Sequence, residues 1–153
     1  MGKKRDRIVG MTFLVGLAVS CLYVYNGTGD SGVSANSSVN WMWNDFDRAL
    51  EKAQTENKCV LLDFWAVWCK ECKEMDKEFE DPEVFNLLDD FVLVKVDVDE
   101  VPQLKAQFAV GGLPVIVVVN NKGEEVARVV GYQDAGQLKQ LLQQVQEVLT
   151  QDL

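Results

Sequence analysis

Cys69 and Cys72 are the residues of this chain whose type and spacing point most directly to chemistry. They follow an apolar run at residues 60–66, within the segment Trp-Cys-Lys-Glu-Cys that begins at Trp68. Two thiols at this spacing, where a strand gives way to a helix, allow one to attack a disulfide and the other to release the product. The spacing therefore predicts thiol–disulfide exchange.

A zinc site and a purely structural disulfide are the alternatives for this pair. A structural zinc site needs four ligands, usually Cys or His, and the chain has no His and 4 Cys in all. The others are Cys59 and Cys21, and Cys21 lies within an apolar stretch, so zinc would need carboxylate ligands. A disulfide across two residues closes so small a loop that it constrains the unfolded chain little. We therefore expect redox exchange, with no metal and no cofactor.

The position of Cys69 at the start of a helix indicates which thiol attacks. Unpaired backbone N–H groups and the positive end of the helix dipole both favour thiolate over thiol there. We expect Cys69 to be the nucleophile and Cys72, nearly one turn further on, to resolve the mixed disulfide. Lys70 favours the Cys69 thiolate whereas Glu71 opposes it, so these two residues predict no direction of electron flow.

Composition limits the classes of function. The 153 residues, 48% of them hydrophobic, suit one globular domain plus an appendage. The net charge is -9, and beyond the basic residues 1–7 it is -12, from 11 basic and 23 acidic residues. Such acidity fits nucleic acid and anionic lipid surfaces poorly. The lack of His excludes Cys-His and Ser-His-Asp catalysis in their usual forms.

The N-terminus has the pattern of a membrane signal. Residues 8–25 form an 18-residue run without charge, near the lower limit for crossing a bilayer. The basic cluster before it is expected to stay in the cytoplasm, which would send the rest of the chain to the bacterial periplasm. We expect residues 1–25 to be an uncleaved single-pass inner-membrane anchor. The alternatives are a signal peptide cleaved after Ala35 and a lipoprotein signal processed at Cys21.

Residues 26–42 are rich in Gly, Ser, Asn and Thr and predict a flexible linker, which leaves residues 43–153 as the folded domain. Apolar periodicity and turn residues predict its elements. Helices are expected at residues 43–57, 69–79, 83–88, 102–108 and 135–149, and strands at 60–65, 91–98, 115–119 and 125–130. This order implies an α/β fold with a central mixed sheet flanked by helices. The cysteines would lie at the carboxyl edge of a central strand, where open α/β sheets usually place their sites.

The chain resembles the thioredoxin family over residues 44–149, nearly the whole of the expected domain. Four segments have that family's order and spacing: Asp63-Phe64-Trp65-Ala66, Trp68-Cys69-x-x-Cys72-Lys73, Gly112-Leu113-Pro114 and Val130-Gly131. Residues 74–84 resemble in particular the C-terminal thioredoxin-like domain of the membrane electron transporter DsbD and small exported thioredoxins. Two departures are the replacement of Gly-Pro by Lys70-Glu71 and Val115 where Thr is frequent.

The resemblance implies roles for two carboxylates. Asp63 lies in an otherwise apolar strand, so it is either a solvent-facing residue of an edge strand or a buried acid with a raised pKa. The resemblance favours the buried acid, which would relay a proton to or from Cys72. Asp76 lies four residues after Cys72 on the same helical face and either shares that task or only solvates the helix.

The resemblance also implies a substrate-binding surface opposite the cysteines. Pro114 would be a cis proline, and Leu113 would offer backbone groups to an extended substrate. Trp68 and Gly131 would complete this surface, although Trp68 could instead be only a core residue. Cys59 is expected to be a small buried apolar residue.

We therefore expect a membrane-anchored, periplasm-facing protein thiol:disulfide oxidoreductase. The reducing direction is favoured by the resemblance to a reductant-side domain and by the lack of the long helical insertion of strong oxidants. Its partners would be periplasmic protein disulfides and a membrane thiol electron donor, without nucleic acid, and we expect a monomer. The alternatives are a reductant for cytochrome c maturation, which usually carries Pro before the second cysteine, and a non-catalytic thioredoxin-fold adaptor or holdase.

Overall fold

The computed structural model describes residues 38–151. Within them the elements follow the order β1 (Met42–Trp43), α1 (Phe46–Glu56), β2 (Cys59–Trp65), α2 (Lys70–Glu78), α3 (Pro82–Leu88), β3 (Phe91–Asp97), α4 (Pro102–Gln107), β4 (Val115–Val119), β5 (Glu125–Val130) and α5 (Ala135–Gln151). The helices and strands expected after residue 43 are all present, and their ends differ from the predicted ones by three residues or fewer.

The strands form one mixed sheet in the order β1-β3-β2-β4-β5 among the described residues. β2 and β3 are parallel, and so are β1 and β3, whereas β4 is antiparallel to both β2 and β5. β2 therefore lies in the middle of the sheet, and its carboxyl end leads directly into the cysteine segment. The register places Asp63 of β2 opposite Lys95 of β3.

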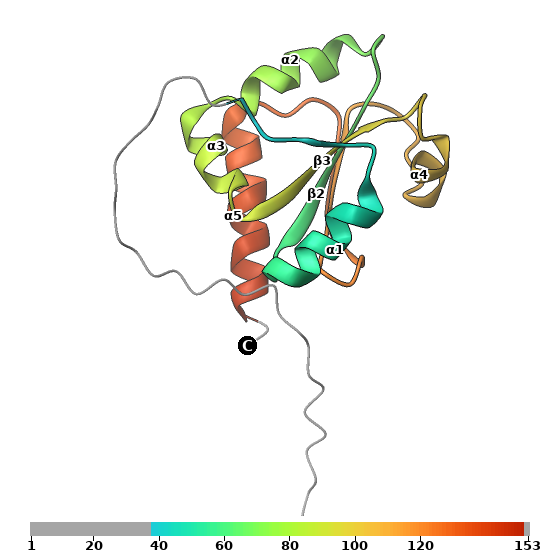
Figure 1. Ribbon diagram of the computed structural model, residues 1–153. Coiled ribbons are helices and arrows are strands. Elements are labelled where there is room, and N and C mark those ends of the chain that lie inside the picture. Colours follow the sequence, from blue (N-terminus) through green and yellow to red (C-terminus); the bar gives the residue numbers. More distant parts are fainter. Residues whose placement is uncertain (1–37, 152–153) are drawn as a thin grey trace, which may run out of the picture.

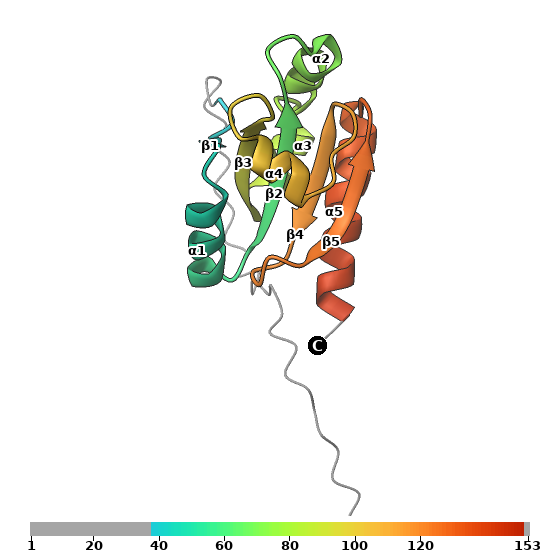
Figure 2. The same cartoon turned by 90° about the vertical axis from the view of Figure 1, so that its right-hand side faces the viewer.

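Helices cover both faces of the sheet (Figures 1 and 2). One face packs against α1 and α4 in what we call the α1/α4 core, which includes Phe46, Leu62 and Leu104. The other face packs against α2, α3 and α5 in the α3/α5 core, which includes Leu61 and Leu142. The alternation of neighbouring β2 residues between the two cores is what a strand covered on both sides requires.

Local signals explain where the helices begin and end. Asp45 caps α1 by accepting a hydrogen bond from the Arg48 N–H, and Asn57 ends the helix in the left-handed conformation. Asp81 caps α3 in the same way, and Pro82 occupies its first turn. The predicted turn between β4 and β5 is closed by the Gly123 N–H, which donates to the Asn120 carbonyl at 2.9 Å.

The packed part of the chain begins earlier than residue 43. Val39 and Trp41 lie against the α3/α5 core, and Met42 lies against the α1/α4 core. Met42 and Trp43 form the short strand β1 in a segment that we expected to be the end of a linker and the start of a helix. The reason is that a two-residue strand has no apolar period for a sequence pattern to show.

The expected membrane anchor at residues 8–25, together with Cys21 and Ala35, lies outside the described residues. Within residues 38–151, no helix is both long enough and apolar enough to cross a bilayer.

Candidate active site

The two cysteines of the motif lie where β2 passes into α2, and they form a disulfide. A tight turn connects β2 to α2 and is closed by the Cys69 N–H, which donates to the Ala66 carbonyl at 3.0 Å. Cys69 is the N-cap of α2, and its sulfur accepts a hydrogen bond from the Cys72 N–H at 3.2 Å. Both are buried, with 3% of Cys69 and none of Cys72 exposed. The sulfur with residual access is therefore the one at the helix start.

The start of α2 favours negative charge on Cys69. Sulfur is a weak acceptor, so a Cys N-cap satisfies the first helical N–H groups less fully than Ser or Asp would. These N–H groups and the helix dipole stabilise a thiolate at this position. Lys70 and Glu71 are both exposed. Water therefore screens the opposite effects of their charges on Cys69.

Asp63 is fully buried within β2. Its Oδ2 accepts a hydrogen bond from the Lys95 ammonium at 2.5 Å, while its Oδ1 has no hydrogen-bond partner among the described residues. Burial raises the pKa of the Asp63 carboxyl above its ordinary value, and the Lys95 ammonium opposes that rise. Of the two alternatives for Asp63, the structure therefore shows the buried acid with a raised pKa. Asp63 is not a solvent-facing residue of an edge strand.

Lys95 is a site residue that sequence reasoning missed. It lies in β3 with a nearly fully buried side chain, and its ammonium also pairs with the Asp76 carboxylate of α2. The signal was available, since Lys95 interrupts an otherwise apolar run, Phe91 to Val96, much as Asp63 interrupts β2. What the pattern lacked was the strand pairing that sets the two residues opposite each other.

Asp76 joins this buried pair to the surface. Its side chain is 41% exposed, and its Oδ1 contacts the Lys95 ammonium. Asp76 therefore does more than solvate the helix, because it is the second carboxylate of one ion cluster. We call Asp63, Lys95 and Asp76 the acid–lysine cluster.

The loop before β4 lies at the edge of the sheet where β2 ends, because Val115 at the start of β4 pairs with Phe64 of β2. The peptide bond between Leu113 and Pro114 is cis, as the resemblance implied. The Gly131 N–H donates to the Pro114 carbonyl at 2.8 Å, which ties the end of β5 to the proline. Gly131 has a φ of +92°, a conformation that strains any residue with a side chain.

Trp68 belongs to the surface rather than the core. It is 68% exposed, and its indole N–H donates to the Asp99 carboxylate at 2.7 Å. Its neighbour Val67 is also exposed, as are Val130 and Tyr132 on either side of Gly131. Exposed apolar side chains thus flank both the cysteine turn and the Gly131 turn. Cys59, by contrast, is buried.

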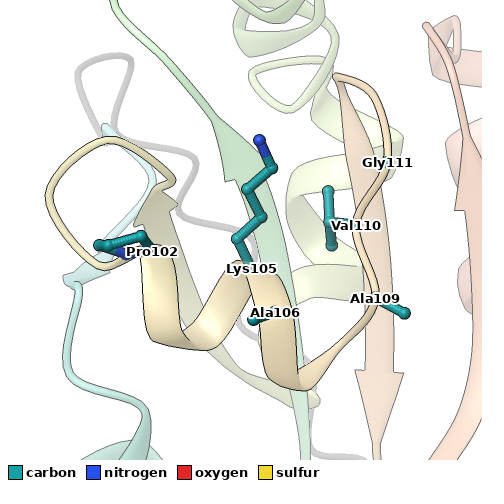
Figure 3. Close-up of a pocket in the computed structure, with 6 residues that line it drawn as sticks. All are labelled: Pro102, Lys105, Ala106, Ala109, Val110 and Gly111. Carbon is teal, nitrogen blue, oxygen red and sulfur yellow. The ribbon is translucent and has the colours of Figure 1, made fainter.

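A shallow apolar hollow of about 370 Å³ lies on α4 and the segment that leads to Pro114. Its lining residues are Pro102, Lys105, Ala106, Ala109, Val110 and Gly111. Figure 3 shows Lys105 extending along the hollow in the direction in which β2 runs. Within residues 38–151, no three His, Cys, Asp or Glu side chains are grouped so that they could hold a metal ion.

Comparisons with known proteins place these features in a family. Residues 46–146 match the family described as a thioredoxin-like domain. Among curated proteins, the thiol:disulfide interchange protein DsbD of Photorhabdus laumondii is 39% identical over 103 residues, which cover 61% of this chain and 18% of that protein. DsbD of Cronobacter sakazakii is 43% identical over 99 residues, 60% of this chain and 17% of that protein. The chain therefore spans less than a fifth of the length of these relatives.

Solved structures agree with this assignment. A thioredoxin from Thermus thermophilus is 30% identical, with a TM-score of 0.62 over 69% of this chain and 86% of that one. The reduced C-terminal domain of Neisseria meningitidis DsbD is 29% identical, with a TM-score of 0.59 over 67% of this chain and 98% of that one. The similarity thus extends over almost the whole of that isolated domain.

Proposed function

Because the chain belongs to the thioredoxin-like domain family, we propose that it is a membrane-anchored, periplasm-facing thiol:disulfide oxidoreductase that reduces disulfides in other proteins. The observation that carries the proposal is the Cys69–Cys72 disulfide at the start of α2, with Cys72 fully buried and Cys69 retaining slight exposure. This asymmetry suits an attacking and a resolving thiol.

The proposed reaction passes two electrons from the reduced protein to the substrate. The Cys69 thiolate attacks one sulfur of a substrate disulfide; a mixed disulfide forms, and the other substrate sulfur leaves as a thiolate. Cys72 then loses its proton and attacks the Cys69 sulfur. The second substrate thiolate leaves, and the Cys69–Cys72 disulfide of the structure results. A membrane thiol donor would return the protein to its dithiol form.

The acid–lysine cluster would handle the Cys72 proton. Asp63 precedes the cysteines on β2, and its raised pKa and unpaired Oδ1 make it suited to accept and return a proton. Lys95 holds the other carboxylate oxygen, and it links Asp63 to the half-exposed Asp76. Asp76 would then be the point at which the cluster exchanges protons with water.

The proposed substrate surface combines Trp68, Leu113, Pro114 and Gly131. The hydrogen bond between Gly131 and Pro114 fixes the spacing of the two turns, while Trp68 presents a large exposed ring anchored by Asp99. An extended substrate segment would pair with the Leu113 backbone as an added strand does.

The reducing direction is supported by the similarity to the DsbD C-terminal domain. The long helical insertion of strong thioredoxin-fold oxidants also has no counterpart in the described residues, where α4 between β3 and β4 is only 6 residues long. We expect a reduction potential nearer to about -270 mV, the value of thioredoxin, than to about -120 mV, the value of the strong oxidant DsbA. Equilibration of the purified protein with a glutathione or dithiothreitol redox buffer measures it.

The decisive test of function uses variants of the two cysteines. The reduced full chain should reduce a protein disulfide, Cys69→Ser should abolish turnover, and Cys72→Ala should accumulate mixed disulfides on Cys69. Recovery of those mixed disulfides from the native host would identify substrates and donor. Full biological function in the Cys69→Ser, Cys72→Ser double variant would instead show a non-catalytic adaptor, and a potential near that of DsbA would refute the reducing direction.

Topology is tested separately. We expect the full chain to remain in the membrane fraction after carbonate extraction and a chain lacking residues 1–25 to be released. After reduction, a membrane-impermeant thiol reagent should label Cys69 in cells whose outer membrane alone is permeable. Labelling only after lysis of the inner membrane would place the domain in the cytoplasm and contradict the proposal.

A further inference from the structure

The Lys95 ammonium is enclosed by aromatic rings as well as carboxylates. Its Nζ lies 5.0 Å from the centre of the Trp41 ring, 5.6 Å from that of Trp65 and 5.8 Å from that of Phe79. These distances are within the range of cation–π attraction, which is strongest for Trp and increases when water is excluded. Three rings and two carboxylates therefore surround one buried cation.

Trp41 differs from the other two rings in its place in the chain. Trp65 ends β2 and Phe79 ends α2, so both belong to the elements that carry the active site. Trp41 comes from the segment before β1, outside the residues that match the family. Figure 2 shows this segment at the β3 edge of the sheet, before the chain enters α1.

The Trp41 ring is held in place by its own contacts. It packs edge-on against Phe79, with ring centres 5.1 Å apart and an angle of 79° between the rings. Residues Met42 and Trp43 that follow pair with Val94 and Lys95 of β3. The backbone of β1 thus lies directly beside the strand that carries Lys95, and the indole covers the ammonium from that side.

We propose that Trp41 is a positioning residue for the redox centre, whose indole closes the acid–lysine cluster and holds the Lys95 ammonium between Asp63 and Asp76. Without this ring, water reaches Lys95 and Asp63 from the N-terminal side. The ammonium is then free to turn toward water, and Asp63 loses much of the burial that raises its pKa. The segment before β1 therefore belongs to the catalytic apparatus and is more than the end of a tether.

The charged groups that bear on Asp63 are few. Lys95 of β3 lowers the pKa of Asp63 and Asp76 of α2 raises it, whereas burial is the largest influence and also raises it. Because burial dominates, admitting water should bring the pKa of Asp63 down toward its ordinary value, even if Lys95 moves. This sets the sign of the expected effect.

The test compares Trp41→Leu with Trp41→Phe and Trp43→Leu in the full chain. Leu removes the ring and part of the volume, whereas Phe keeps a ring that can face the ammonium. Trp43 is the matched control, because it lies on the same segment and its ring contacts Trp65. It meets Lys95 through the backbone pairing of β1 with β3, which Leu retains, and its ring is not among those described around the ammonium. Circular dichroism and thermal unfolding verify that each variant is folded.

The readout is the pKa of Asp63, measured by NMR of chains labelled with ¹³C at the aspartate carboxyl carbon. The Asp63 signal is identified by its loss in Asp63→Asn. We expect Trp41→Leu to lower this pKa by roughly one unit, and Trp41→Phe and Trp43→Leu to leave it near the wild-type value. No shift beyond that of Trp43→Leu, or a shift upward, would overturn the proposal.

The catalytic meaning of this inference rests on the proposed function, but the titration does not need turnover. If Trp41→Leu lowers the pKa of Asp63, the pH profile of protein disulfide reduction should move in the same direction by the same amount. A lowered pKa in a protein that reduces no disulfide would leave the Trp41 contact standing and refute the function. If the protein reduces disulfides but Trp41→Leu leaves the pKa of Asp63 unchanged, the proposed function stands and the role of Trp41 is refuted.

Discussion

Asp63 and Lys95 face each other across two parallel strands, each buried to a degree that neither would tolerate alone. Removing one partner of a buried ion pair typically costs about 3–5 kcal/mol, because the other charge is left in a medium that solvates it poorly. Here the Asp76 carboxylate gives Lys95 a second partner. The cluster can therefore lose or gain a proton at Asp63 without leaving an isolated charge.

At the residue scale, Asp63→Asn should change how stability depends on pH. The folded-state pKa of Asp63 is raised above its ordinary value, so the folded protein holds this proton more tightly than the unfolded chain does. Wild-type stability should therefore fall as pH rises from about 4, where an unfolded Asp ionises, to the folded pKa of Asp63, and then level off.

Asn does not titrate, so this contribution is absent from the variant. As pH rises through this window, the wild type should lose stability that Asp63→Asn does not lose. The free energy of unfolding of the variant should therefore increase relative to that of the wild type. Urea unfolding at a series of pH values measures the difference. Parallel pH profiles for the two proteins would contradict the raised pKa.

At the element scale, the backbone requires glycine in the turn after β5, whereas the backbone and packing leave Gly112 of the loop before β4 free to carry a side chain. Gly131 has positive φ, whereas a Cβ at Gly112 would meet no atom within 4 Å, and the φ of Gly112 lies outside the left-handed region. Gly131 is thus required by its backbone conformation. The bare surface at Gly112 leaves room for an approaching partner backbone beside Pro114.

These two glycines give a matched pair of variants. Gly131→Ala should lower the free energy of unfolding by about 1–2 kcal/mol, the cost of a left-handed residue with a side chain. Gly112→Ala should change it by less than about 0.5 kcal/mol but raise KM for a protein disulfide several-fold. Urea unfolding and steady-state kinetics separate the two effects. An unchanged KM in Gly112→Ala would remove this loop from the substrate surface.

Glu78 at the end of α2 is hydrogen-bonded to the residues that follow Gly131. Its carboxylate accepts hydrogen bonds from the Tyr132 hydroxyl at 2.7 Å and from the Ala135 N–H at 3.1 Å. The hydrogen bond to Glu78 is the main reason why the pKa of Tyr132 is raised to about 12. One carboxylate thus links the end of α2 to the turn between β5 and α5.

Replacing Glu78 by Gln should bring the pKa of Tyr132 down toward the ordinary tyrosine value of about 10, because the negative charge that opposes tyrosinate is gone. Ultraviolet absorbance of tyrosinate during an alkaline titration measures it. Tyr132→Phe identifies the signal, since Tyr23 and Tyr25 also titrate. A Tyr132 pKa that stays near 12 in Glu78→Gln would show that another group is responsible.

At the scale of the whole molecule, two cores lie on opposite faces of one sheet (Figure 2). Leu62 belongs to the α1/α4 core and Leu142 of α5 to the α3/α5 core, and at most 1% of either is exposed. The active site draws on both cores, because Cys72 packs with the first and Met75 with the second. The sheet between them separates the two sets of contacts.

Truncation of one leucine in each core should therefore be additive. Leu62→Ala and Leu142→Ala should each lower the free energy of unfolding by about 2–5 kcal/mol, through lost burial and the cavity that remains. The double variant should lose the sum to within about 0.5 kcal/mol, since the two side chains belong to different cores. A clear departure from that sum in urea unfolding would mean that the sheet transmits strain between the cores.

The amino-acid sequence by itself determined the elements from α1 to α5 and the redox pair, but not β1. Apolar periods, helix caps and the Asn120–Gly123 turn depend on neighbours along the chain, so they can be read without the fold. The cysteine spacing likewise lies within one turn of a helix. The motifs therefore named Cys69, Cys72 and Pro114, but it is the pairing of Phe64 with Val115 that brings the end of β2 and the start of β4 to one edge of the sheet.

Only the tertiary structure decided what surrounds Asp63. Lys95 is opposite Asp63 because β2 and β3 pair in one register, and a shift of one residue would turn Lys95 to the other face. Trp41 reaches Lys95 because β1 pairs with β3, although nothing periodic marks so short a strand. These contacts join residues far apart in the chain, and their energies depend on burial, which a local pattern does not contain.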